Sequence, residues 1–194
     1  MLKLSHDDST RIHAALHAAQ SRTDARFALM IAPVSDRYGL YPLAFAGALA
    51  LAVGGALAFF WQDIGLRIGF LIEAAAFGLT AIVCDWQPIK LALVPKPIRV
   101  MRARTMAHRE FAAGILAAQD HKDGIVFFAS LGERYVEIIA SRDLHARVGE
   151  EAWNGIVSAF AQRAKQGQLV QGFVDAIEAC ARHLETHYPA ALAA

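Results

Sequence analysis

The fold of this chain is decided by an uncharged stretch from residue 40 to residue 60, LYPLAFAGALALAVGGALAFF. A bilayer core of roughly 30 Å needs about 20 helical residues, and this stretch is long enough to cross it. Tyr38 and Tyr41 lie at one end, and Phe59, Phe60 and Trp61 lie at the other. Aromatic residues are typical of the two membrane interfaces, so the stretch predicts a transmembrane helix.

A second apolar run, Leu66–Cys84, follows after a very short connection at residues 62–65. Its charges are Arg67 at the start and Glu73 farther in, and Trp86 lies just beyond it. The two runs predict a helical hairpin with both ends on one side of the membrane. The alternative is a buried helical pair in a soluble protein, which runs this long and this poor in charge disfavour.

Basic residues indicate which side holds the chain termini. The hairpin tip has only Arg67, whereas the terminal side carries Arg22, Arg26, Arg37, Lys90, Lys96, Arg99, Arg102, Arg104 and Arg109. Basic residues beside a span favour the cytoplasm. The first ten residues lack the apolar core of a signal peptide. We therefore expect an integral protein of the inner or plasma membrane with both termini cytoplasmic.

Two features inside the hairpin could matter for function. Ala46, Ala50, Gly54 and Ala58 form a row of small residues at four-residue spacing. Such a row allows close helix packing, either within the hairpin, which we favour, or between copies of the chain. Glu73 is the membrane-functional candidate, because a carboxylate at this depth is costly unless it is paired or protonated. No second acidic or basic residue lies deep in either span, so an ion or proton pathway has little support.

Over the whole chain, 56% of residues are apolar and 19% are charged, with a net charge of +1. All but three of the charged residues lie outside residues 40–84, so the rest of the chain has the composition of an ordinary folded domain. This composition excludes a disordered protein and a nucleic-acid binder that works by bulk charge. Residues 1–37 and 99–194 are expected to fold together as one domain, interrupted by the hairpin and a Pro-rich segment at 38–98.

The predicted elements of that domain make it a small α/β sandwich with helices on a short sheet. Ser5 and Asp8 indicate a capped helix start, and Gly167 indicates a helix end. The Pro-rich stretch 85–97 is expected to be a stiff interfacial segment. Expected helices cover residues 6–20, 99–118, 150–166 and 169–187, and expected strands cover 27–32, 125–130 and 135–141, with Glu137 presented on one face of the last strand.

Candidate chemistry is sparse, because the common nucleotide-binding, zinc-protease and hydrolase motifs are missing from the sequence. Asp120, Asp123 and Asp143 lie near strand ends, where carboxylates could hold Mg²⁺ or Ca²⁺; the alternative is that they are loop and cap residues. The pairs His13/His17 and His183/His187 supply two ligands each, which is too few for zinc. Cys84 and Cys180 are expected to be buried thiols.

The early arginines of the 99–118 helix, Arg99, Arg102 and Arg104, are placed to face anionic headgroups. Nucleic acid is the rival partner for this cluster. Its position beside a membrane span favours lipid.

Three segments together resemble the TPM domain family. They are GIVFFASLGERYVEIIASR at 124–142, WNGIV at 153–157 and GQLVQGFVDAI at 167–177. The similarity runs from about Met106 to Tyr188 and resumes more weakly at 6–33. The chain is similar in particular to a bacterial branch with a two-helix membrane hairpin inserted after the first strand.

The resemblance implies an α/β sandwich. It also implies acid phosphatase-like activity, divalent-cation binding or assistance to membrane complexes, with Asp120, Asp123 and Asp143 as the catalytic and metal candidates. Two features depart from the family pattern: the domain is expected on the cytoplasmic side, and Arg142-Asp143-Leu144 lacks the family's glycine. We therefore expect a binding or assembly module for membrane proteins or for itself. The alternative is a metal-dependent phosphatase-like hydrolase.

Overall fold

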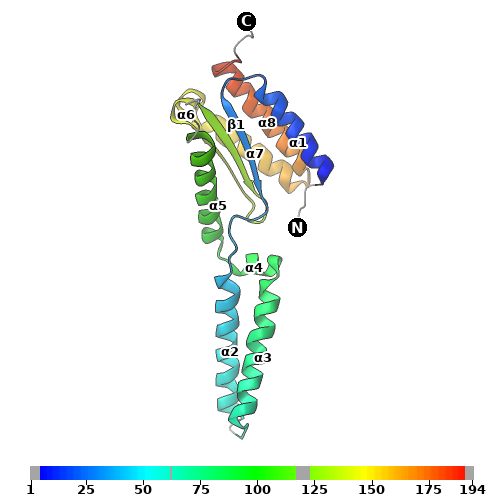
Figure 1. The fold of residues 1–194 in the computed structure, drawn as a ribbon, viewed down its shortest axis with the longest axis vertical. Coiled ribbons are helices and arrows are strands. Elements are labelled where there is room, and N and C mark those ends of the chain that lie inside the picture. Colours follow the sequence, from blue (N-terminus) through cyan, green and yellow to red (C-terminus); the bar gives the residue numbers. More distant parts are fainter. Residues whose placement is uncertain (1–4, 62, 117–122, 191–194) are drawn as a thin grey trace. The chain divides into compact units, whose positions relative to one another are not determined.

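The computed structural model describes residues 5–61, 63–116 and 123–190 (Figure 1). The chain divides into two compact units. Met1–Ser35 and Met101–Ala194 form an α/β unit, and Asp36–Val100 forms a helical unit. The helical unit is thus an insertion between two chain segments that share one fold, and its ends lie close to the predicted boundaries at 37/38 and 98/99.

The described residues of the α/β unit form a three-stranded sheet in the order β1-β2-β3. β1 (Arg26–Ala32) pairs in parallel with β2 (Gly124–Ser130). β2 pairs in antiparallel fashion with β3 (Tyr135–Ala140). Every residue of the central strand β2 is buried, because both faces of the sheet are covered.

Helices cover the sheet on both sides. One face contributes Ile125 and Phe127 to a core with α1 (His6–Gln20), α7 (Glu150–Lys165) and α8 (Leu169–His187). The other face packs Val126 and Phe128 against α5 (Lys96–Phe111) and the π-helical turn η1 (Ala112–Leu116). Figure 1 shows α5 on one side of β1 and the α1, α7 and α8 layer on the other. The predicted small α/β fold is therefore confirmed.

Several local signals have the geometry that the sequence predicts. The Ser5 hydroxyl accepts a hydrogen bond from the Asp8 amide at 3.1 Å, and the Asp8 carboxylate accepts one from the Ser5 amide at 3.0 Å. This capping box satisfies amides that would otherwise lack partners at the start of α1. Gly167, with a φ of 78°, follows the end of α7.

Other segments differ from the prediction. The Pro-rich stretch 85–97 contains a short helix, α4 (Gln87–Leu93), with Pro88 in its first turn. Proline is tolerated there because a first-turn amide needs no helical acceptor. The helix expected at 99–118 begins earlier, at Lys96, and gives way to η1 after Phe111. A further short helix, α6 (Arg142–Val148), follows β3 and was not predicted.

The helical unit consists mainly of α2 (Leu40–Phe60) and α3 (Leu66–Asp85), which pack side by side. Ala46 and Ala50 are buried. A Cβ added at Gly54 would lie 3.0 Å from the Cδ atom of Glu73. Part of the small-residue row therefore serves packing within the hairpin. Both helices are long and apolar enough to cross a membrane.

Candidate functional site

One edge of the sheet gathers the polar residues that the sequence singles out. β1 and β2 both start at this edge, because Arg26 is in register with Gly124. β3 ends there, because Ala140 pairs with Ile125 near the start of β2. Asp123 immediately precedes β2, and Asp143 lies in the first turn of α6 directly after β3. The topology thus brings these two predicted carboxylates to the same edge.

Tyr188, at the end of α8, organises this edge. Its phenol donates a hydrogen bond of 2.6 Å to the Oδ2 atom of Asp123. The Arg147 guanidinium carbon lies 5.3 Å from the centre of its ring. The backbone carbonyl oxygen of Tyr188 accepts hydrogen bonds from the Thr23 hydroxyl at 2.6 Å and the Asp24 amide at 3.1 Å. We name Asp123, Asp143, Arg147 and Tyr188 the sheet-edge cluster.

The cluster keeps its phenol protonated. Burial raises the pKa of Tyr188, and the hydrogen bond to Asp123 and the charges of Asp123 and Asp143 raise it further, while Arg147 opposes them. Both carboxylates therefore act on one phenol. The neutral phenol is a hydrogen-bond donor to Asp123, and carboxylates are oxygen ligands of the kind that Ca²⁺ and Mg²⁺ prefer.

The structure tests the predicted metal candidates only in part. Asp120 lies outside the described residues. Across 5–61, 63–116 and 123–190, no three His, Cys, Asp or Glu side chains are grouped to hold a metal. Asp123 and Asp143 thus supply at most two ligands among the described residues. The same result applies to the histidine pairs of α1 and α8, which gain no third ligand there.

Sequence reasoning missed Tyr188 and Arg147. Tyr188 and Asp123 are 65 residues apart, and neither position carries a local motif. The signal available in the sequence is weak: a tyrosine directly after a long amphipathic helix, and an arginine four residues beyond Asp143. Only the packing of α8 along the sheet brings these groups together.

A second polar cluster lies where β3 faces α5. Glu137 accepts a hydrogen bond of 2.9 Å from the Tyr135 phenol. Its other oxygen lies 3.6 Å from the Nε2 atom of His108 and 3.8 Å from the Nε atom of Arg104. Burial raises the pKa of Tyr135, and the bond to Glu137 adds to the effect. The sequence indicated that β3 presents Glu137 on one face, and the structure supplies its partners.

Glu73 lies in α3 of the hairpin, and its side chain is half-buried. Its carboxyl group lies over Gly54 of α2, within 3.1 Å of a Cβ built on that glycine. The absence of a side chain at Gly54 leaves room for Glu73 between the helices.

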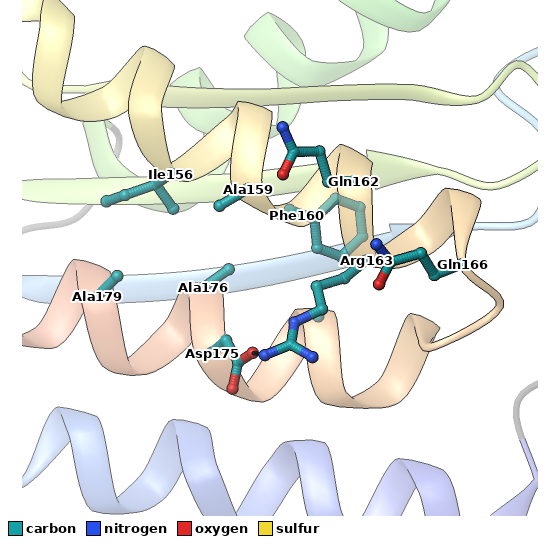
Figure 2. Close-up of a pocket in the computed structure, with 10 residues that line it drawn as sticks. Ile156, Ala159, Phe160, Gln162, Arg163, Gln166, Asp175, Ala176 and Ala179 are labelled. Atoms are coloured by element: carbon teal, nitrogen blue, oxygen red, sulfur yellow. Dashed lines mark ion pairs between the residues drawn. The ribbon is translucent and has the colours of Figure 1, made fainter.

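A groove of about 330 Å³ lies between α7 and α8. Figure 2 shows the Arg163 side chain reaching across it to Asp175. The Arg163 Nη2 to Asp175 Oδ2 distance is 3.1 Å, and Nη1 donates to Gln168 at 2.7 Å. Gly172 lets the helices approach, since a Cβ there would lie 3.1 Å from the Cβ of Arg163. The protein's own ion pair thus occupies the polar rim of the groove.

The fold has a counterpart among solved structures. The NMR structure of the BA42 protein from the psychrophilic bacterium Bizionia argentinensis superposes with a TM-score of 0.52 and 13% sequence identity. The match covers 97% of this chain and 86% of that protein. No protein-family model and no curated protein sequence matches the chain. At this identity the similarity shows a shared fold.

Proposed function

We propose that this chain is a membrane-anchored TPM-like protein whose α/β unit faces the cytoplasm, where it serves as a binding or assembly module for membrane proteins. The hairpin spans the bilayer as α2 and α3, and the residues before and after it fold together into the α/β unit.

The exposed apolar surface of the hairpin is the observation that carries this proposal. In their most apolar windows, 11% of α2 and none of α3 is buried. The core helices of a soluble protein would be mostly buried. Large apolar side chains point outward along both helices, among them Phe45, Leu51, Phe70, Leu79 and Ile82. Exposed apolar residues in this number mark a membrane or partner interface.

Charge supports the orientation. Nine Lys or Arg residues flank the terminal side of the hairpin in the sequence, against Arg67 at the tip side. Arg67 lies in the first turn of α3, where its side chain can extend toward headgroups. The distribution favours a cytoplasmic α/β unit.

Cysteine accessibility tests the topology. Asp63→Cys places a thiol at the tip and Arg11→Cys places one on exposed α1, while the native Cys84 and Cys180 are buried. A membrane-impermeant maleimide should label the tip variant in intact cells, and the α1 variant only after permeabilisation. The reverse pattern would overturn the orientation, and extraction by alkaline carbonate would overturn the membrane anchor.

The assembly role predicts that the protein is not a strict monomer. Protein extracted from native membranes in mild detergent should migrate in a complex larger than one chain, and harsh detergent should release the monomer. A strict monomer in mild detergent, with no specific protein recovered after crosslinking in membranes, would remove the support for an assembly module.

Divalent-cation chemistry at the sheet edge is the second candidate function, because the sheet topology brings Asp123 and Asp143 to the same edge. A phosphatase-like hydrolase would use Asp120, Asp123 and Asp143 to hold Ca²⁺ or Mg²⁺, which polarises a phosphoryl oxygen. Either ion should then raise the melting temperature, and Asp123→Asn should abolish the rise, whereas Asp7→Asn on exposed α1 should not. No shift with the wild type, and no hydrolysis of p-nitrophenyl phosphate, would exclude this function.

A further inference from the structure

The side of α5 that is not buried against the sheet is exposed and basic. Ala103, Ala107 and Phe111 recur at four-residue spacing and are buried against the sheet. The opposite side of the helix, within the α/β unit, consists of Met101, Arg102, Arg104, Thr105, His108 and Arg109, all of them exposed. We call these six residues the basic face.

The charge of this helix is strongly one-sided. The whole of α5 carries five Lys or Arg residues and one acid, Glu110. Among the described residues, the Glu137 carboxylate lies 3.8 Å from Arg104 and 3.6 Å from His108, and the Glu110 carboxylate lies 3.8 Å from Arg109. The Nε atom of Arg104 also donates a hydrogen bond of 3.4 Å to the Nε2 atom of His108. The contacts with Glu137 and Glu110 are longer than hydrogen bonds, so Arg104 and Arg109 keep guanidinium donors for a ligand.

The layout of the face favours a lipid surface as its ligand. At 100° per residue, Met101 and Thr105 lie along the middle of the exposed side. Arg102 and Arg109 lie on one flank, and Arg104 lies on the other. Met101 is 54% exposed although it is apolar. An apolar side chain between arginines suits the boundary between headgroups and acyl chains, where arginine stems lie flat and their charges reach phosphates.

Nucleic acid fits the face less well. Basic grooves that bind single strands add aromatic side chains on which bases stack. The exposed residues of the basic face include no aromatic ring other than the imidazole of His108.

We propose that the basic face of α5 binds the anionic phosphate headgroups of a lipid bilayer. This inference rests on the proposed membrane anchor and adds a lipid specificity to it. In the sequence α5 begins at Lys96, shortly after the second span ends at Asp85, so the anchor supplies a high local concentration of lipid. Arg99 is excluded from the face, because its Nε atom is buried.

The test uses the full-length protein in lipid nanodiscs. Thr105→Cys, labelled with the environment-sensitive dye NBD, reports on the middle of the face, and unsubstituted protein measures background labelling of the two buried cysteines. One set of discs is made of phosphatidylcholine and a second contains added phosphatidylglycerol. The charge variant combines Arg102→Gln, Arg104→Gln and Arg109→Gln. Its matched control changes three exposed basic residues elsewhere, Arg11, Lys165 and Arg142, to Gln.

Phosphatidylglycerol should shift NBD emission to the blue and increase its intensity, and added salt should reverse both changes. Each arginine near an anionic surface contributes about a fivefold preference, so the charge variant should lower the ratio of docked to undocked protein by more than ~10-fold. The control variant should behave as the wild type does.

Three results would overturn the proposal. The first is equal NBD emission in both kinds of disc, and the second is an equal loss in the two triple variants. The third is binding of single-stranded RNA to protein in phosphatidylcholine discs that the charge variant alone abolishes, which would assign the face to nucleic acid. Co-elution of the protein with discs is measured first: its failure would overturn the membrane anchor as well, whereas co-elution without an NBD response would overturn the lipid-binding face alone.

Discussion

Glu133 should stabilise the segment around Ser35, where the chain leaves the α/β unit for the inserted hairpin. It lies in the turn between β2 and β3 and is only 7% exposed. Its carboxylate accepts a hydrogen bond of 2.7 Å from the amide of Ser35, the last residue of the first segment of the α/β unit. It also accepts a hydrogen bond from the buried Ser130 hydroxyl. We predict that Glu133→Ala destabilises the α/β unit strongly.

The expected size follows from these contacts. A hydrogen bond to a charged group is worth about 1.5–3 kcal/mol, and a buried polar group left without a partner costs about 1–3 kcal/mol. Alanine removes both bonds and leaves the Ser130 hydroxyl unpaired, but it also relieves the cost of burying a carboxylate. The net loss should be about 2–4 kcal/mol. Glu133→Gln keeps the shape and one acceptor oxygen but loses the charge, so it should cost about 1–2 kcal/mol.

The assay is denaturant unfolding of the full-length protein in detergent. Trp153 is buried in the core of the α/β unit, whereas Trp61 and Trp86 are exposed in the helical unit. Replacing the latter two with Phe makes fluorescence a report on the α/β unit alone. Glu151→Ala, an exposed carboxylate in the first turn of α7, is the control and should change stability by less than about 1 kcal/mol.

A double-mutant cycle with Ser130→Ala sharpens the test. In the Ser130→Ala background, Glu133→Ala no longer strands the Ser130 hydroxyl, so its cost should fall by about 1 kcal/mol. The reasoning is refuted if Glu133→Ala costs no more than the control, or if its cost is unchanged in the Ser130→Ala background.

Three further predictions concern local packing and pH. Gly124→Ala should destabilise the α/β unit by about 1–3 kcal/mol in the same assay, because its Cβ would lie 2.7 Å from a carbonyl oxygen of β1. Gly155→Ala has open space around its Cβ in α7 and should stabilise the unit by about 0.5–1 kcal/mol. The opposite order of stabilities would contradict the parallel register of β1 and β2. Because the pKa of Tyr188 is raised, the stability that this phenol contributes is fully present below pH 10.0, its ordinary pKa, and is lost as pH rises through the raised pKa. Asp123→Asn should move the midpoint of the phenolate absorbance titration of Tyr188 back toward 10.0. An unchanged midpoint would exclude the coupling between Asp123 and Tyr188. Burial, with nearby positive charge, lowers the pKa of His183 from 6.5. The stability that the neutral imidazole contributes is therefore present above pH 6.5 and is lost as pH falls through the lowered pKa. His183→Gln should flatten the dependence of unfolding free energy on pH in this range, and an unchanged dependence would show that His183 is not its cause.

Most of the α/β fold could be predicted from local patterns. The capping box at Ser5, the continuous apolar strand before Pro33 and the stripe of α8 are short-range signals whose physical causes lie within a few residues. The exceptions are α4 and α6. Both are short helices whose sequences carry prolines or mixed polarity, so local signals for them are weak and packing decides.

The candidate site was less predictable. Asp123 and Asp143 were expected at one edge because strand ends share an edge in a sheet, and the antiparallel pairing of β2 and β3 brings them there. Tyr188 and Arg147 could not be predicted, because they reach that edge only through the packing of α8 and α6 against the sheet.

The sequence by itself determined the apolar hairpin, its insertion into an α/β domain and the one-sided distribution of charge, because these depend on composition and on periods of a few residues. Tertiary structure alone decided the parallel pairing of β1 with β2 across the insertion, the carboxylate–phenol contact at the sheet edge and the burial of the Arg99 Nε atom, which removes Arg99 from the basic face. The physical reason is chain separation. Contacts between residues many positions apart depend on which apolar faces pack together, and no short sequence pattern encodes that choice.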